Sequence, residues 1–513
     1  MTTEKLREEV EKIYDKLVEY APVAGKVSSE VVDQYRVSAR NLYNYLIMRS
    51  FDNRKIHDSL SDLGISSLRS AEGYVLTTVV KILKLLYLIQ GETWEDRIEV
   101  GDLDYSTSKK MLLANADRLF NDTQRSYRTE IMVTMPDEAA EDYDWVKTLI
   151  QEGMEIARIN LSHGNTRLWK KILKNVNKAS RDLASPVKVY MDLPGPKIRT
   201  KRIKVRSNQG HTQEFIKVKE GEELVLTKRK TSGAEAQYGE ANQQLYAAEV
   251  GVLLPQIIDD LNVGDKVFFD DGKIEAVVIA KDPTDVKLSI LRTHKKKLSS
   301  NKGINLPDTH LHLSSLTKKD IELLPFVSKH ADLVGYSFVR KAEDVNKLYQ
   351  ELDKLGDTRL GVIFKIENKE AFNKLPSILF EGMKRNNIGV MIARGDLAVE
   401  IGFDRISEVQ DQILWICEAA HVPVIWATQV LENQAKTGIA TRAEISDAAL
   451  SAKAECVMLN KGPYMLDAVR TLRSIIIRME AHSFKKKSSS RALKVAKRNV
   501  KAMNQKMMAT LPT

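Results

Sequence analysis

Eight short apolar runs, spaced along the chain from Arg128 onward, constrain the fold more than any other feature. Each run is rich in residues typical of strands, and most are separated by segments with helical periodicity. Strands that alternate with helices form parallel sheets, and eight such units are typical of a closed (β/α)8 barrel. The predicted strands are 130–135, 155–161, 187–193, 331–337, 359–366, 387–393, 423–427 and 455–460.

Residues 201–300 interrupt this alternation after the third predicted strand. The segment contains short β runs with turn residues between them, and Asp271-Gly272 is typical of a hairpin turn. We therefore expect a small β domain inserted into the barrel. The barrel itself would be built from residues 126–200 and 301–483, ending in a helix over 467–482.

Residues 1–125 are predicted to form a separate helical domain. The first helix has apolar residues at helical spacing, and a second is expected to begin at the cap-like residues 28–30. The apolar run 74–90 contains two lysines and is predicted to be a packed helix. No run reaches the roughly 18 apolar residues of a membrane span, and the N-terminus lacks the apolar core of a signal peptide. We expect no membrane partner and a cytoplasmic location.

The net charge of +10 is concentrated at one end of the chain, since residues 484–513 carry nine Lys and Arg and no Asp or Glu. The remaining chain is nearly neutral, so the sequence does not favour a nucleic-acid-binding body. We expect a basic C-terminal tail capable of weak polyanion contact. It is either a solvated appendage or a helix packed through its apolar positions, which are Ala492, Val495, Ala496 and Val500.

The two cysteines, Cys417 and Cys456, both fall in predicted core elements. They are expected to be buried thiols in a reducing compartment, because two buried cysteines do not make a disulfide framework or a metal site.

Charged residues follow two neighbouring predicted strands where each strand ends. Lys365 and Glu367 are two residues apart, so they point to the same side of the strand. Asp396 follows the next strand, and the carboxyl ends of barrel strands meet at one face. Two carboxylates beside a lysine suit a hard divalent cation, although strand-end salt bridges would give the same pattern.

Three segments in order along the chain resemble the catalytic core of pyruvate kinase: KIEN at 365–368, ARGDLAVEI at 393–401 and PVIWATQVLE at 423–432. The resemblance extends over about residues 128–482. It implies a barrel with a lid domain inserted after the third strand. It also implies phosphoryl transfer from phosphoenolpyruvate to ADP, giving pyruvate and ATP in glycolysis. Further similar segments are 152–165, 191–200, 301–308 and 336–345.

The resemblance also implies roles for single residues near the substrate. Glu367 and Asp396 match the ligands of Mg²⁺, for which Mn²⁺ could substitute. Lys365 matches the lysine that stabilises the transferring phosphoryl group and the enolate, and Arg158 matches the arginine that pairs with the phosphate. The amides of Gly395 and Asp396 match those that hold the substrate carboxylate.

Two further groups of residues carry implied roles. Thr428 matches the threonine beside the carbon that is protonated, with a water relay because a hydroxyl is a poor acid. Potassium-dependent relatives read DTKGPEIRT where this chain reads DLPGPKIRT, so Lys197 replaces a glutamate and potassium is not expected to be required. The nucleotide phosphates would lie against His163, Arg199 and Lys302, and the monovalent-cation region would be matched by Asn160, Ser162, Asp192 and Lys197.

The sequence departs from the family pattern mainly on the nucleotide side. Residues 135–139 read MPDEA where relatives have IGPAS, and residues 460–463 replace a longer SGETAKG loop. Relative to the family pattern we expect the N-terminal helices to be an addition and the C-terminal allosteric domain of common relatives to be replaced by the basic tail. Three interpretations stay open: a divergent pyruvate kinase that forms a homo-oligomer; a phosphoenolpyruvate- and Mg²⁺-binding barrel with another acceptor; and a non-catalytic regulatory or scaffold protein.

Overall fold

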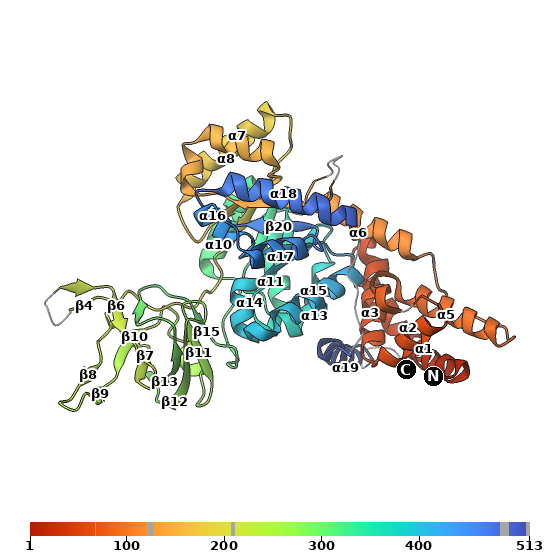
Figure 1. The fold of residues 1–513 in the computed structure, drawn as a ribbon, viewed down its shortest axis with the longest axis horizontal. Helices are drawn as coiled ribbons and strands as arrows, with labels where there is room; N and C mark the ends of the chain where they lie inside the picture. Colours follow the sequence, from red (N-terminus) through yellow and green to blue (C-terminus); the bar gives the residue numbers. More distant parts are fainter. Residues whose placement is uncertain (67, 122–126, 207–210, 483–491, 509–513) are drawn as a thin grey trace.

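The computed structural model describes residues 1–66, 68–121, 127–206, 211–482 and 492–508 (Figure 1). Eight parallel strands close into a barrel in chain order, and the first strand pairs with both the second and the last. All eight predicted strands and the (β/α)8 barrel are confirmed. The barrel strands are β1 (Glu130–Thr134), β2 (Ile156–Asn160), β3 (Lys188–Asp192), β16 (Leu333–Tyr336), β17 (Gly361–Ile366), β18 (Ile388–Ala393), β19 (Val424–Ala427) and β20 (Cys456–Leu459).

Amphipathic helices surround the strands, as their apolar periodicity predicts. In α8 the side chain of Asn165 caps the first turn by accepting N–H bonds from Arg167 and Leu168, both at 3.1 Å. The helices are α7 (Tyr143–Glu152), α8 (Thr166–Asp182), α10 (Lys318–His330), α11 (Ala342–Lys354), α12 (Lys369–Asn373), α13 (Leu375–Gly382), α14 (Arg394–Ile401), α15 (Ile406–Ala419), α16 (Glu432–Thr437), α17 (Arg442–Ser451) and α18 (Met465–His482).

The β domain follows β3, as expected, and lies to one side of the barrel (Figure 1). Its six-stranded sheet has the order β10-β7-β13-β12-β11-β15 and encloses an apolar core separate from that of the barrel. The predicted hairpin at Asp271-Gly272 is confirmed between β11 and β12. The sheet comprises β7 (Glu223–Thr227), β10 (Ala248–Gly251), β11 (Lys266–Phe269), β12 (Ile274–Lys281), β13 (Asp285–Thr293) and β15 (Ile304–Asn305).

The helices of the N-terminal region pack on the amino-terminal side of the barrel and share its apolar core. The expected helix start at residues 28–30 is wrong: Ser29 ends α2, and α3 begins at Arg36. Ser28 instead donates its hydroxyl hydrogen to the Arg36 carbonyl at 2.8 Å, which ties the intervening turn together. The helices are α1 (Thr3–Glu19), α2 (Ala21–Ser29), α3 (Arg36–Arg49), α4 (Arg54–Asp62), α5 (Val75–Ile89) and α6 (Tyr105–Leu119).

The end of α6 closes the amino-terminal end of the barrel. Leu119 and Phe120 belong to the cluster of apolar side chains inside the barrel. A Cβ atom on Gly361 or Gly389 would lie 2.9 or 2.7 Å from the Leu119 methyl groups. The two glycines at the starts of β17 and β18 therefore leave the space that Leu119 occupies.

The C-terminal segment is partly packed rather than solvated. Helix α19 (Lys494–Met508) lies against α3 (Figure 1). Val495 and Ala496 are fully buried, and the Leu493 N–H donates to the Arg49 carbonyl at 3.1 Å. Of the two alternatives for the tail, the structure has the packed helix, α19, while residues 483–491 and 509–513 lie outside the described residues. No helix in the described parts of the chain is long and apolar enough to span a membrane.

Candidate active site

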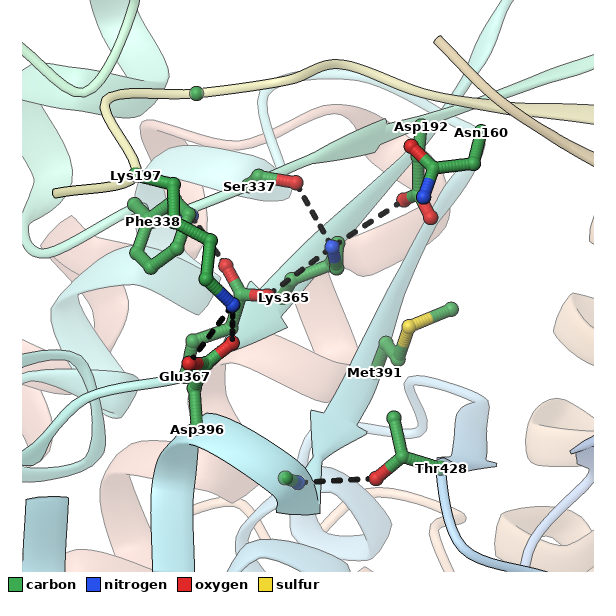
Figure 2. A network of polar contacts seen from close by, with 12 residues as sticks. Asn160, Asp192, Lys197, Ser337, Phe338, Lys365, Glu367, Met391, Asp396 and Thr428 are labelled. Carbon is green, nitrogen blue, oxygen red and sulfur yellow. Dashed lines mark hydrogen bonds and ion pairs between the residues drawn. The ribbon is translucent and has the colours of Figure 1, made fainter. Parts of the chain in front are cut away.

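Charged side chains gather at the carboxyl ends of β2, β3, β17 and β18. Figure 2 shows Asp192, Lys365, Glu367 and Asp396 of this group. Lys365 lies at the centre of this group, with its side chain buried. Its ammonium is 2.8 Å from Ser337 Oγ, 3.1 Å from Glu367 Oε1 and 3.4 Å from Asp192 Oδ1. Burial acts to lower the pKa of Lys365, but the two carboxylates outweigh it and raise the pKa above its ordinary value.

Arg158 and Asp192 form a buried ion pair beside Lys365. The guanidinium Nε donates to Asp192 Oδ2 at 2.6 Å, and Nη1 donates to Thr134 Oγ1 at 2.8 Å. The Tyr190 hydroxyl donates to Asp192 Oδ1 at 2.7 Å. Burial would raise the pKa of Asp192, but Arg158 and Lys365 hold it below its usual range. Asp192 therefore fixes the positions of two cations.

Glu367 and Asp396 lie together on the other side of Lys365. Glu367 Oε2 accepts the Phe338 N–H at 2.6 Å, and burial together with the charge of Asp396 raises the pKa of Glu367. The Lys197 ammonium lies 3.1 and 3.0 Å from the two carboxylate oxygens of Asp396. The Lys197 ammonium is thus a cation that contacts Asp396 and lies near Glu367.

The segment after β19 has a left-handed backbone, with φ of +65° at Thr428 and +59° at Gln429. Such angles are strained for non-glycine residues and cluster at functional sites. Arg394 supports the turn, because its guanidinium donates to the carbonyls of Ala427 and Thr428 and pairs with Asp447. Thr428 Oγ1 accepts the N–H of Gly395 at 3.0 Å, so this amide is engaged by the threonine.

The residues expected at the nucleotide are divided between two places. His163 lines a cavity of about 270 Å³ together with Arg158, Asn160 and Lys461. Burial, then the charges of Lys461 and Arg199, lowers the pKa of His163, so the imidazole is neutral near pH 7.

Arg199 and Lys302 lie at the base of the β domain. Arg199 Nη1 donates to the Asn301 carbonyl at 3.0 Å, and the Lys302 ammonium pairs with Asp270 at 3.0 Å. Arg199 is near enough to lower the pKa of His163, whereas Lys302 is held by the β11–β12 turn.

The expected monovalent-cation region is not brought together as one cluster. Asn160 accepts the Ser162 N–H at 3.0 Å and lies near Asp192. Lys197 lies at Asp396, with Lys365 between it and Asp192 (Figure 2).

Several residues of the site are not among those the sequence singled out for it. Tyr190 precedes Asp192 by two positions and therefore shares its face, which is a signal that alternation along the strand could have provided. The amide of Phe338 and the pair Arg394–Asp447 depend on contacts between distant elements and leave no local pattern. Glu400 lies one helical turn after Asp396, and burial raises its pKa to about 7.

An eight-stranded parallel barrel with buried charges at the carboxyl ends of its strands defines a (β/α)8-barrel protein with an enzyme-like site. The family described as "Pyruvate kinase, barrel domain" matches residues 126–469. The chain belongs to the pyruvate kinase family.

Individual relatives agree with this assignment. The chain is 31% identical over 374 residues to a pyruvate kinase of Staphylococcus epidermidis, covering 71% of this chain and 59% of that protein. It is 31% identical over 362 residues to the pyruvate kinase of Geobacillus stearothermophilus, covering 69% and 57%. A crystal structure of a pyruvate kinase from Cryptosporidium parvum superposes with a TM-score of 0.60 at 26% identity, covering 70% of each chain. The chain thus spans less than two thirds of the length of these bacterial relatives.

Proposed function

We propose that this protein is a phosphotransferase that moves the phosphoryl group of phosphoenolpyruvate to ADP, giving pyruvate and ATP. The observation that carries the proposal is the arrangement of Lys365 between Asp192 and Glu367, with Asp396 alongside. Family membership and the names of the relatives support it.

Glu367 and Asp396 would hold a divalent cation. The Lys197 ammonium on both oxygens of Asp396 marks this as a position that favours positive charge. Within the described residues no group of three or more His, Cys, Asp or Glu could hold a metal ion. Two carboxylates suit Mg²⁺ or Mn²⁺, which would complete their shells with substrate oxygens and water. When bound, the cation would neutralise charge on the phosphate and carboxylate of the substrate.

Lys365 and Arg158 are the side-chain cations that would contact the substrate, in addition to the metal ion. Lys365 is charged and fixed by three partners, so it offers a preorganised donor to charge that develops on the phosphoryl and enolate oxygens. Arg158 keeps one edge of its guanidinium on Asp192, and its position in the cavity beside β2 suits contact with phosphate.

Thr428 would position the proton donor for the enolate carbon. Its hydroxyl accepts from Gly395, so its own hydrogen is available to a water or to the substrate. The high pKa of a hydroxyl makes the threonine a relay partner and not the acid itself. For the substrate carboxylate to bind at the Gly395 amide, this N–H would have to leave Thr428 Oγ1 and donate to the carboxylate instead.

The identity of the phosphoryl acceptor is the part of the proposal for which a second candidate exists. ADP phosphates would lie along the neutral His163 and along Lys461, which both line the cavity, with Arg199 close enough to His163 to lower its pKa. Lys461 and Arg199 would supply the positive charge. Because the loop 460–463 differs from that of the family, transfer to a different acceptor is the second candidate function. Because Lys197 replaces the glutamate of potassium-dependent relatives, we expect no potassium requirement, although the lysine lies at Asp396 and not beside Asn160 and Asp192.

A coupled assay of pyruvate release tests the proposal, using the full chain with Mg²⁺, phosphoenolpyruvate and a panel of nucleoside diphosphates. We expect ADP-dependent release, equal rates in potassium chloride and tetramethylammonium chloride, and loss of at least about a thousandfold in turnover for Asp396→Ala. Bound phosphoenolpyruvate without diphosphate-dependent release would favour the second candidate. Activity of Asp396→Ala within tenfold of the parent would reject the metal assignment, and activation of about tenfold or more by potassium would reject the role of Lys197.

A further inference from the structure

A second polar cavity, of about 410 Å³, lies at the amino-terminal ends of the barrel strands. The first residues of β3, β16 and β17 line it, together with the ends of α6 and α10. Lys365 and Glu367 lie at the opposite ends of the strands, so this cavity is separate from the candidate active site. Its volume is within the range of small-molecule sites.

Four permanently charged basic side chains line the cavity from four different segments, and they are Arg118, Lys188, Lys329 and Arg359. Arg118 donates to the neutral Asn115 at 3.2 Å. Among the residues that the structure describes, neither Arg118, Lys329 nor Arg359 forms an ion pair. Lys188 has only a distant partner, with its ammonium 4.0 Å from Asp332.

The two carboxylates that line the cavity are already engaged by neighbouring groups. Asp332 accepts the Val189 N–H at 2.8 Å. Asp357 accepts hydrogen bonds from the Ser328 hydroxyl at 2.5 Å and from the amides of Arg359 and Leu360. The cations outnumber the carboxylates by two. Lys188 is near Asp332, and Arg359 is near enough to Asp357 to lower its pKa, whereas Arg118 and Lys329 form no ion pair among the described residues.

His330 also lines the cavity, next to Lys329. Burial first, then the charges of Lys329 and Lys170, lowers its pKa. The imidazole is therefore neutral near pH 7 and offers a hydrogen bond instead of an additional charge.

Without a bound anion, the basic side chains that line the cavity repel one another. A bound anion would lower this repulsion. Guanidinium groups match phosphate oxygens in two-point contacts, and here they approach from α6 and from the segment before β17. We propose that this cavity binds a small phosphorylated anion, which fastens α6 and the N-terminal helices to the barrel. Leu119 lines the same cavity and occupies the space above Gly361 and Gly389, so the ligand would act where the two parts meet.

Inorganic pyrophosphate is a suitable probe, and lysine acetylation read by mass spectrometry gives residue-level evidence with the full chain. We expect pyrophosphate to protect Lys188 and Lys329 from acetylation while Lys12, which is exposed on α1, stays reactive. Protection of Lys461 alone would mean that the probe binds only in the active-site cavity. That outcome would overturn the proposal while leaving the proposed catalytic function untouched.

Paired variants provide the second arm of the test. Arg118→Gln and Arg359→Gln remove exposed cations, so the fold is expected to survive, and each should weaken pyrophosphate binding about tenfold or more by calorimetry. The matched control is Arg36→Gln, an exposed arginine of the N-terminal region outside the cavity, which should bind as the parent does. Equal affinity of the parent and both cavity variants would overturn the proposal.

Discussion

The two ends of the barrel use charge in opposite ways. At the carboxyl ends of the strands, Lys365, Arg158 and their carboxylates are buried and paired with one another. At the amino-terminal ends, Leu119 fills the axis and the surrounding cations are exposed and mostly unpaired. The difference indicates that one end is preorganised for chemistry, while the other holds the N-terminal helices in place and presents a positive surface.

The largest effect, on turnover, is expected from removing a charge at the carboxyl ends of the strands, where the charged residues are paired. Lys365→Met should lower turnover about a thousandfold while changing phosphoenolpyruvate binding much less, because in the proposed reaction Lys365 would act on charge that develops in the transition state. Steady-state kinetics and equilibrium binding separate the two quantities. The control is Lys374→Met, a half-buried lysine between α12 and α13 that pairs with Glu370 of α12, and it should retain parental turnover.

Loss of buried charge can also destabilise the fold, so unfolding must be followed in parallel. If Lys365→Met does not fold, Lys365→Arg keeps the charge and displaces it, and its turnover should still fall. A variant that loses substrate affinity and keeps its turnover would make Lys365 a binding residue only.

A medium effect, on stability, is expected from truncating Leu119, which with Phe120 forms an apolar plug at the amino-terminal end of the barrel. Leu119→Ala should lower the free energy of unfolding by about 3 kcal/mol, since it leaves a cavity over Gly361 and Gly389. Turnover of the folded variant should change little, because the plug lies at the end remote from the site. Denaturant unfolding measures the loss. Leu88→Ala, at an exposed position of α5, is the control and should be nearly neutral, and equal losses in both variants would contradict the plug.

A smaller, pH-dependent effect is expected where the N-terminal helices meet the barrel. The buried His421 ring contacts Ser38, Ser108 and the Gly73 carbonyl, and burial lowers its pKa to about 4. Between pH 6.5 and 4 the unfolded chain binds more protons than the folded one, so stability falls as pH decreases. From pH 7 to 5 this group should cost about 2 kcal/mol.

The His421→Asn variant tests this contribution. Asparagine tolerates the left-handed backbone at this position, where φ is +50°. Unfolding at several pH values should show a shallower acid dependence for the variant, by about 2 kcal/mol between pH 7 and 5. The His211→Asn variant, exposed in the β domain, should follow the parent. An unchanged slope for His421→Asn would contradict the assignment.

The barrel was predictable because each strand is a local apolar run, and most of these runs are separated by segments with helical periodicity. Lys365 and Glu367 could be placed on one face by alternation alone. Their partners could not be predicted this way, since Ser337 and Asp192 reach Lys365 from the ends of the nearby strands β16 and β3. The plug and the packing of α19 on α3 likewise depend on contacts between segments far apart in sequence. The left-handed turn at Thr428 left no signal, because it contains none of the glycines that usually mark such a backbone.

The closing seam of the barrel has a consequence for how the chain folds. Strand β1 pairs with β20 along four residues, with Glu130 opposite Cys456. Side chains reinforce the seam, as Thr129 and Thr134 donate to the carbonyls of Ala454 and Leu459. Contacts of such long sequence separation form late, because the entropy of closing the loop must be lost before they contribute. During synthesis one edge of β1 therefore stays unpaired until β20, the last barrel strand, has been made. We expect this unpaired edge to be the point at which newly made chains are most exposed to aggregation.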